Sequence, residues 1–259
     1  MVRDRRQTPL PSFDCGRYRQ HVACDLRGCR RHDHRGFERG ALPACGEVKS
    51  GSGAVSVQRP EHRQRGSAVP GLPRKGARMK LLIASDLHGS AYYCEKLLEA
   101  FQREEADRIL FLGDLLYHCP RNDLPEGYDT KKTAAMLNAR KNKIFCVRGN
   151  CDTEVDQMVL QFPVLADYAV LQAGDRLIYA THGHVHNMQN VPFLQPGDIL
   201  LHGHTHVPAW THFGDHNLYL NPGSLSLPKQ NSPHSYMTLE DGVFVYKDLS
   251  GGVYHEVRI

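Results

Sequence analysis

Short polar motifs in the sequence combine carboxylates and imidazoles in a pattern that suits metal binding. They are Asp86-Leu-His88, Gly113-Asp114, Gly149-Asn150-Cys151-Asp152, His182-Gly-His184 and Gly203-His204-Thr205-His206. Carboxylate, imidazole and amide ligands without thiolate pairs favour Mn, Fe, Zn or Ni over Ca or a structural zinc. About seven such groups exceed the needs of one ion, whereas two ions sharing a bridging carboxylate would use them all. Such a pair generates hydroxide at neutral pH and holds a phosphoryl group.

Each motif alone has an ordinary structural explanation. Asp86 and His88 could be a helix cap beside a surface histidine, and Gly-Asp or Gly-Asn-x-Asp could be a simple turn. The "GHTH" motif could end a hairpin with solvated imidazoles. All of them follow expected strands, and this joint occurrence favours one shared site.

The expected strands of the first half are short apolar runs separated by amphipathic helices. The runs "KLLIAS", "RILFL" and "KIFCV" cover residues 80–85, 108–112 and 143–147. One helix follows a cap at or near Ser90, and a second is expected around residues 131–141. This order predicts a mainly parallel sheet with helices on its outer face. Ligands of such sheets bind at the carboxyl ends of the strands, where the motifs lie.

Beyond Asp167 the spacing shortens and indicates strands joined by tight turns. A hairpin is expected around Ala173-Gly174-Asp175, and further strands follow in "DILLHGHTH", "PAWTHFG", "NLYLNPGS", "SYMTLED" and "VFVYKD". Two sheets with helices outside each would form one α/β sandwich over residues 79–259.

Residues 1–78 have a different composition. They contain 17 lysines and arginines against 7 acidic residues, whereas residues 79–259 contain 15 against 21. Few aliphatic residues and no sustained period predict disorder, and a basic arm for nucleic acid is the alternative. Met79 opens "MKLLIASDLHGS" like the start of a domain, so we expect the upstream segment to be a translated leader from a misassigned start codon.

The chain carries no sign of export or membrane insertion. No apolar run reaches the roughly 20 residues of a transmembrane helix, and the basic start lacks a signal peptide's apolar stretch. We expect all eight cysteines to be reduced thiols. The paired spacing of a zinc site is missing from the four in the first segment, which are Cys15, Cys24, Cys29 and Cys45. The expected location is the cytoplasm.

The ordered motifs resemble the calcineurin-like metallophosphoesterases, and in detail their small bacterial YfcE-type phosphodiesterase subgroup. "IASDLHGS", "GDLLYHCPRN" and "LPEGY" look like segments of that subgroup. The resemblance covers Met79 to about Ile259 and none of the first 78 residues. It implies a four-layer α/β/β/α sandwich.

The resemblance also implies a ligand set and a reaction. One metal would take Asp86, His88 and His206, the other would take Asn150, His182 and His204, and Asp114 would bridge them. Hydroxide between the metals would attack the phosphorus of a small phosphodiester in line. We expect Mn²⁺, with Zn²⁺, Ni²⁺ or Fe²⁺ as alternatives.

The motifs depart from the wider family at Cys151. Many members carry a histidine there, which stabilises the transition state or protonates the leaving group. The bacterial subgroup shares the cysteine form, and we expect Cys151 to neighbour the site without a chemical role. His184, or else His118, is then the candidate proton donor. We expect Asp152 to orient a ligand histidine or to cap the next helix.

Arg121 and Asn122 follow Asp114 in a loop and are candidates for phosphate contact, with a solvated loop as the alternative. "NPGS", residues 221–224, is expected to be a turn that supports the metal site.

Two other functions remain open. A scaffold that kept the fold would be free to lose ligands, whereas all seven are present. A nuclease would favour a basic groove, whereas residues 79–259 are net acidic, so small diesters are expected rather than nucleic acid. The oligomeric state stays open, and a homo-oligomer is one option.

Overall fold

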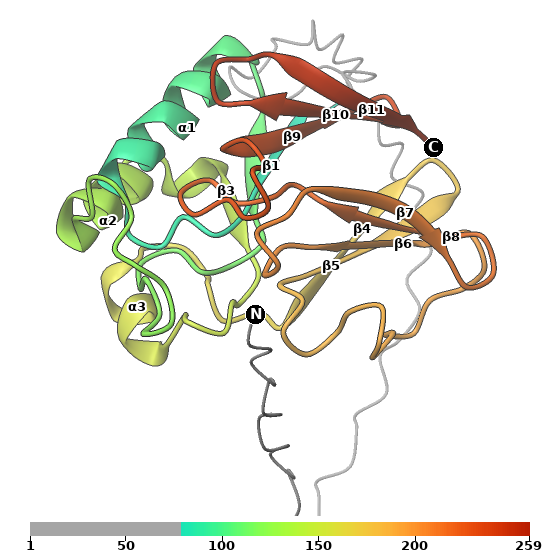
Figure 1. Ribbon diagram of the computed structural model, residues 1–259, viewed down its shortest axis with the longest axis horizontal. Coiled ribbons are helices and arrows are strands. Elements are labelled where there is room, and N and C mark those ends of the chain that lie inside the picture. Colours follow the sequence, from blue (N-terminus) through green and yellow to red (C-terminus); the bar gives the residue numbers. More distant parts are fainter. Residues whose placement is uncertain (1–78) are drawn as a thin grey trace, which may run out of the picture. The chain divides into compact units, whose positions relative to one another are not determined.

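The computed structural model describes residues 79–259, which fold around two β-sheets with α-helices (Figure 1). The predictions for residues 1–78, namely disorder, a basic arm and no zinc site, lie outside the described residues. No helix within residues 79–259 has the length and apolar character that crossing a membrane requires.

The first sheet contains the three parallel strands expected in the first half of the domain. Leu82 lies opposite Ile109, and Leu110 lies opposite Phe145, in parallel register. The carboxyl-terminal strands extend the sheet in antiparallel fashion beyond β1. In spatial order the strands are β11 (Val253–Arg258), β10 (Val243–Asp248), β9 (Ser235–Glu240), β1 (Leu81–Ala84), β2 (Arg108–Phe111) and β3 (Ile144–Cys146).

The second sheet contains the expected hairpin at one edge. Its two strands pair antiparallel around a turn at Gly174 and Asp175, which confirms that prediction. The next two pairings, β5 with β6 and β6 with β8, are parallel. In spatial order the strands are β4 (Tyr168–Ala173), β5 (Arg176–Thr181), β6 (Ile199–His202), β8 (Asn217–Asn221) and β7 (Ala209–Phe213).

The helices begin at capping residues. Ser90 caps α1 (Ala91–Arg103) by accepting the Tyr93 N–H at 3.1 Å, as the sequence predicted. The second expected helix is split into α2 (Thr130–Asn138) and a 3₁₀ turn at Lys141–Lys143. The short α3 spans Glu154–Val159.

Two apolar layers hold the domain together. Leu82, Ala84 and Phe111 point from the first sheet toward Leu97 and other buried helix residues. Their neighbours in the same strands point the opposite way and pack against the second sheet. β1 and β2 are therefore buried on both faces, which explains why their sequences are continuous apolar runs.

The helices lie outside the first sheet only (Figure 1). The mixed α/β fold with two sheets is confirmed, but within residues 79–259 the second sheet has no helical outer layer. Residues 183–198 lie against the outer face of the second sheet without forming a helix. They contact the sheet through His186 and Gly197. Pro192 and Pro196 interrupt any helical pattern in this segment.

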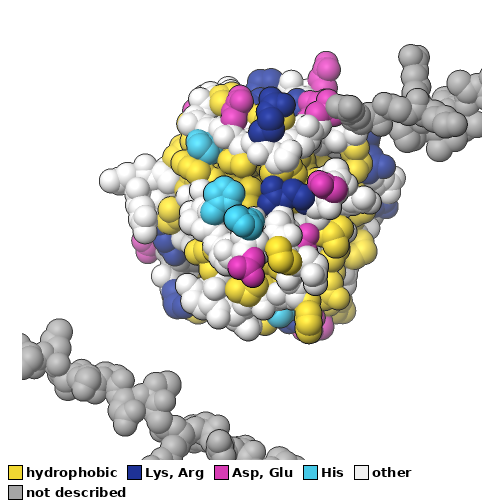
Figure 2. Space-filling model, turned by 90° about the vertical axis from the view of Figure 1, so that its right-hand side faces the viewer, with side chains coloured by type: hydrophobic (Ala, Val, Ile, Leu, Met, Phe, Trp, Pro, Cys, Tyr) yellow, Lys and Arg dark blue, Asp and Glu magenta, His cyan; other side chains and the backbone are white. Residues whose placement is uncertain are grey.

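Apolar side chains also reach the surface on the side away from the helices. Figure 2 shows them as patches broken by charged and histidine side chains. Trp210 is 41% exposed and stacks on His255, with ring centroids 3.8 Å apart. Trp210 therefore packs within the domain, and the contact leaves the oligomeric state open.

A buried ion cluster fastens the end of α1 to the first sheet. Glu104 ends the helix and accepts the Tyr236 O–H at 2.7 Å. Its carboxylate also lies 2.7 Å from the Lys247 Nζ and 3.4 Å from the Lys80 Nζ. Because Glu104 is 8% exposed, these contacts neutralise a charge that burial would otherwise penalise.

Replacing Glu104 with Gln should lower the free energy of unfolding by about 2 kcal/mol at neutral pH, since Lys247 loses a buried counter-ion. Burial raises the pKa of Glu104, but Lys247 and Tyr236 outweigh it and hold the pKa below its ordinary value. The contribution is therefore present above the unfolded-state pKa and lost as the pH falls through the lower folded-state value. Urea unfolding of both proteins at acidic and neutral pH measures the difference.

Glu105→Gln, a change at the exposed neighbouring residue, is the matched control and should leave stability unchanged. Equal stabilities of the wild-type protein and Glu104→Gln at neutral pH would contradict this role of the cluster.

Candidate metal centre

The predicted ligands lie in loops at the carboxyl ends of strands, and many have an unusual backbone conformation. A positive φ is costly for an L-residue unless the surroundings hold it. The His88 N–H donates to the Asp114 carbonyl at 2.9 Å, and the Asp86 N–H donates to the Gly113 carbonyl at 3.2 Å. Five predicted ligands have positive φ: Asp86 (57°), His88 (49°), Asp114 (57°), His204 (66°) and His206 (63°).

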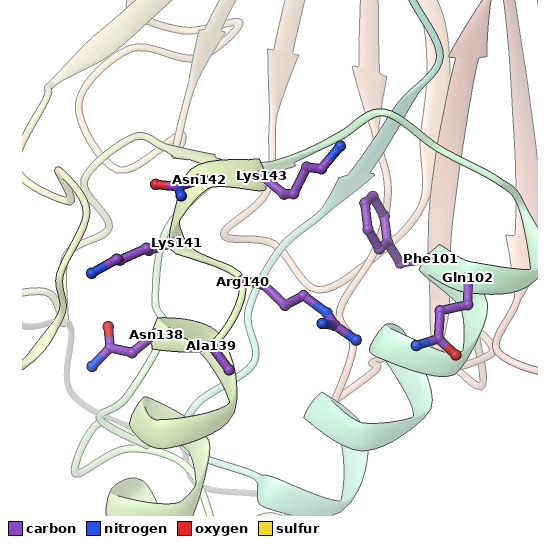
Figure 3. Close-up of a pocket in the computed structure, with 8 residues that line it drawn as sticks. All are labelled: Phe101, Gln102, Asn138, Ala139, Arg140, Lys141, Asn142 and Lys143. Carbon is purple, nitrogen blue, oxygen red and sulfur yellow. The ribbon is translucent and has the colours of Figure 1, made fainter. Parts of the chain in front are cut away.

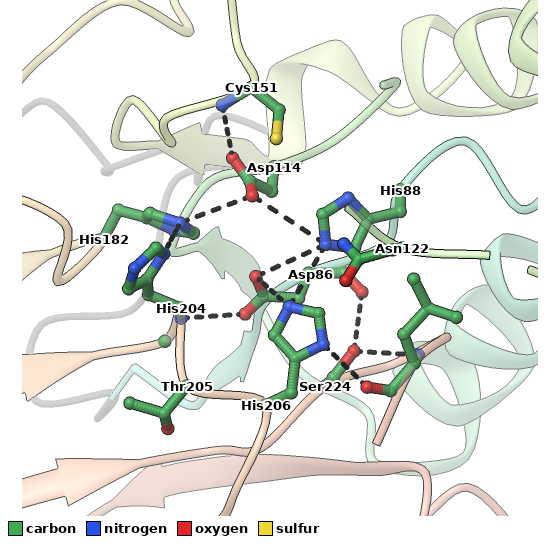
Figure 4. Close-up of polar contacts among 12 residues, drawn as sticks. Asp86, His88, Asp114, Asn122, Cys151, His182, His204, Thr205, His206 and Ser224 are labelled. Carbon is green, nitrogen blue, oxygen red and sulfur yellow. Dashed lines mark hydrogen bonds and ion pairs between the residues drawn. The ribbon is translucent and has the colours of Figure 1, made fainter. Parts of the chain in front are cut away.

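Asp86, His88 and His206 form a first group (Figure 4). The His88 and His206 Nε2 atoms are 3.3 Å apart, and the His206 Nε2 lies 3.2 Å from the Asp86 Oδ1. All three side chains are buried. Three ligand atoms of the kind that transition metals prefer therefore converge on one point.

The hydrogen bonds of the His88 and His206 rings indicate which kind of group would bind at this point. The His88 Nδ1 bonds to the Tyr117 carbonyl and the His206 Nδ1 to the Leu227 carbonyl, both at 2.7 Å. A carbonyl only accepts, so each Nδ1 carries a proton, and the Nε2 that faces inward has a free lone pair whenever the ring is neutral. Two lone pairs and a carboxylate oxygen then face one another. This arrangement is repulsive unless a proton or a metal cation lies between them.

A second group forms around His182. The His182 Nδ1 bonds to the Leu112 carbonyl at 2.6 Å, so its Nε2 faces inward. This Nε2 lies 3.0 Å from the Asn150 Oδ1, 3.1 Å from the His204 Nδ1 and 3.4 Å from the Asp114 Oδ2. The second group therefore offers one amide oxygen, one carboxylate and two imidazoles.

Asp114 lies between the two groups. Its Oδ2 is 3.4 Å from the His182 Nε2 and 3.8 Å from the His88 Nε2, while its Oδ1 accepts the Cys151 N–H at 2.8 Å. The carboxylate thus faces both groups, as a bridging ligand must.

The charges in the site favour cations. Burial lowers the pKa of His182, but Asp114 and Asp86 outweigh it and raise the pKa to about 9. Burial and then the His182 charge lower the pKa of His204 to about 4, which keeps its imidazole neutral at neutral pH. The two carboxylates therefore attract positive charge: without a metal they hold a proton on His182, which a bound cation would replace, and His204 has a lone pair to offer.

Asp152 is not placed as the sequence predicted. Its carboxylate accepts the backbone N–H groups of Gly149, Asp114 and Leu115 at 2.7, 2.8 and 2.9 Å. It bonds to no ligand histidine, and Thr153 rather than Asp152 caps α3. Asp152 therefore fixes the loop that carries Asp114.

The "NPGS" turn supports the other side of the site. The Ser224 and Ser226 hydroxyls donate to the Asp86 carbonyl at 2.9 and 3.0 Å. The Asn221 Nδ2 donates to the Gly203 carbonyl at 2.9 Å, just before His204. Within residues 79–259 no hydrogen-bond donor is assigned to the buried Asp86 Oδ1, which fits a cation as its partner.

Cys151 lies at the edge of both groups. Its Sγ is within 4.8 Å of ligand atoms of His88 and Asp114, and it accepts the Asn150 Nδ2 at 3.2 Å. Burial raises the pKa of the Cys151 thiol far above its usual range, and the Asp114 charge raises it further. A protonated thiol is a poor ligand and a poor nucleophile.

The predicted proton donor and substrate contacts lie beside the ligands. His184 is exposed, and its ring centroid is 5.4 Å from that of His182. A cavity of about 280 Å³ opens on the ligands. Its lining consists of Asp114, Cys119, Arg121, Asn122, Asn150, His204, His206 and Lys229.

Lys229 was not among the predicted residues. A single exposed lysine in a turn gives no sequence signal. The Asn122 side chain donates to the His118 carbonyl at 2.9 Å, so it shapes its own loop as well as the cavity.

A second cavity, of about 310 Å³, lies between the ends of α1 and α2 (Figure 3). Arg140, Lys141 and Lys143 line it, but no histidine or carboxylate does. Cations at this position complement the carboxyl end of α2. Within residues 79–259, every group of three His, Cys, Asp or Glu side chains close enough to hold a metal belongs to the site described above.

Comparisons with known proteins agree with this geometry. Phosphodiesterase YfcE of Escherichia coli (strain K12) is 45% identical over 165 residues, which cover 64% of this chain and 89% of that protein. Probable metallophosphoesterase YsnB of Bacillus subtilis (strain 168) is 31% identical over 172 residues, which cover 63% and 86%. The solved structure of the E. coli phosphoesterase YfcE matches with a TM-score of 0.67 and 42% identity, over 70% of this chain and all of that chain.

The family model described as the calcineurin-like phosphoesterase superfamily domain matches residues 79–241, which include all the candidate ligands. This match and the identity to YfcE show that the chain belongs to the calcineurin-like phosphoesterase superfamily.

Proposed function

We propose that this protein is a metal-dependent phosphodiesterase that binds two divalent cations and hydrolyses small phosphodiesters. The observation that carries the proposal is the convergence of imidazole nitrogens and carboxylate oxygens on two adjacent points. The similarity to a relative named phosphodiesterase supports the reaction class.

The donor set fits two cations of the transition series. When bound, they supply Lewis acidity and lower the pKa of a water so that it can attack phosphorus at neutral pH. Mixed nitrogen and oxygen ligands suit Mn²⁺, with Zn²⁺, Ni²⁺ and Fe²⁺ as alternatives. One cation would be held by Asp86, His88 and His206, and the other by Asn150, His182 and His204. Asp114 would contribute its carboxylate to both.

The residues of the chain position the substrate. Arg121 lines the cavity beside the ligands, where its guanidinium can grip two phosphate oxygens. Asn122 shapes the same wall. A cavity of about 280 Å³ has room for a small diester rather than a polymer, which supports small substrates over nucleic acid.

We also propose a cytoplasmic location and a homo-oligomeric state. The four cysteines of residues 79–259 are free thiols, which suits a reducing compartment.

Metal-depleted protein should hydrolyse bis(4-nitrophenyl) phosphate only after Mn²⁺ is restored. Asp114→Asn should lower kcat by about 100-fold or more, because the amide removes a charge that faces both metal positions. Release of 4-nitrophenol at a series of Mn²⁺ concentrations measures both effects.

Asp123→Asn changes an exposed acid in the nearby loop and should retain wild-type turnover. An absence of metal-dependent turnover, or full activity of Asp114→Asn, would overturn the proposal.

We further propose that His184 protonates the leaving alcohol, because it is the exposed imidazole next to His182 and Cys151 cannot take that part. His184→Ala should then slow diphenyl phosphate, which has a poor leaving group, by about 100-fold. The kcat for bis(4-nitrophenyl) phosphate, whose leaving group needs little protonation, should fall much less. Measuring kcat for both diesters gives the ratio.

His212→Ala, an exposed histidine on β7, is the control and should leave both rates unchanged. An equal loss on both diesters would show that His184 is not the proton donor.

A further inference from the structure

Lys229 is a cation held beside the candidate metal centre. Its side chain lines the same cavity as Arg121, Asp114 and His206. Its backbone N–H donates to the His206 carbonyl at 3.1 Å, and its own carbonyl accepts the Ser232 N–H at 3.1 Å. Because these bonds fix the backbone, the lysine side chain must emerge next to a proposed metal ligand.

Neither Lys229 nor Arg121 forms an ion pair with a carboxylate of residues 79–259. Other lysines of this region do, such as Lys247 with Glu104 and Lys96 with Glu99. Residues 79–259 are net acidic, with 21 Asp and Glu against 15 Lys and Arg. Two cations without a carboxylate partner among residues 79–259 therefore line the same cavity, although this region is net acidic.

The charge of a simple diester does not require both of these cations. The carboxylates of Asp86 and Asp114, a hydroxide and a singly charged diester are enough to neutralise two divalent cations. Arg121 can stabilise the extra negative charge that collects on the phosphate oxygens during attack. The charge of Lys229 then has no counterpart among the carboxylates of residues 79–259 or in a diester with neutral arms.

We propose that Lys229 forms an anion subsite for a second negative group, a carboxylate or a phosphate, on one arm of the phosphodiester. The identity of the scissile group rests on the proposed function, whereas the subsite rests on the cavity and its cations. The lysine suits this role because its ammonium is a compact charge with three donors on a flexible stem. Its exposure predicts a modest, salt-sensitive preference for substrates with the second charge.

Binding of two matched phosphonates tests the subsite without turnover. Propylphosphonate and 3-phosphonopropionate have similar size, but only the second carries a carboxylate. Titration calorimetry of the full chain, with and without Mn²⁺, should show about fivefold tighter binding of 3-phosphonopropionate at low salt. The preference should shrink as NaCl is added.

Lys229→Gln should abolish this preference, and Lys131→Gln, an exposed lysine of α2 outside this cavity, should keep it. The ligand 1,3-propanediphosphonate tests whether a phosphoryl group takes the subsite better than a carboxylate. No difference between the matched ligands on the wild-type protein, or the same difference in Lys229→Gln, would overturn the subsite. Because no turnover is measured, this outcome is separate from a failure of the hydrolysis assay.

Discussion

The site depends on the hydrogen bonds that orient its imidazoles. In His88, His206 and His182 the Nδ1–H donates to a backbone carbonyl, so each Nε2 atom points inward. Lone pairs and the carboxylates of Asp86 and Asp114 then converge within a buried volume. A cation is the natural partner of such a set, and the remaining features of the site keep these groups in place.

Much of the surrounding structure serves to hold strained loops. The left-handed conformations of Asp86, His88 and Asp114 persist because backbone hydrogen bonds join their loops across the first sheet. Asp152 fixes the Asp114 loop through three N–H groups, and Ser224 fixes Asp86. The two sheets meet with their strand ends on one side, which lets loops from both sheets supply ligands.

The sequence predicted the three parallel strands of the first sheet, the β4–β5 hairpin and the clustering of the motifs, because continuous apolar runs and strand-end polar residues leave a local pattern. It did not predict β11. It did not predict the role of Asp152, which depends on a loop 38 residues away. It missed Lys229 and the Glu104 cluster for the same reason, since both depend on contacts between distant segments. It also placed helices outside the second sheet, where residues 183–198 form none.

Anomalous X-ray diffraction at the manganese edge, from crystals grown with Mn²⁺, tests the central claim most directly. The account predicts two peaks about 3.5 to 4 Å apart. One should lie beside His88 and His206, the other beside His182 and Asn150, with the Asp114 carboxylate between them. A single peak, or peaks away from these side chains, would contradict the account.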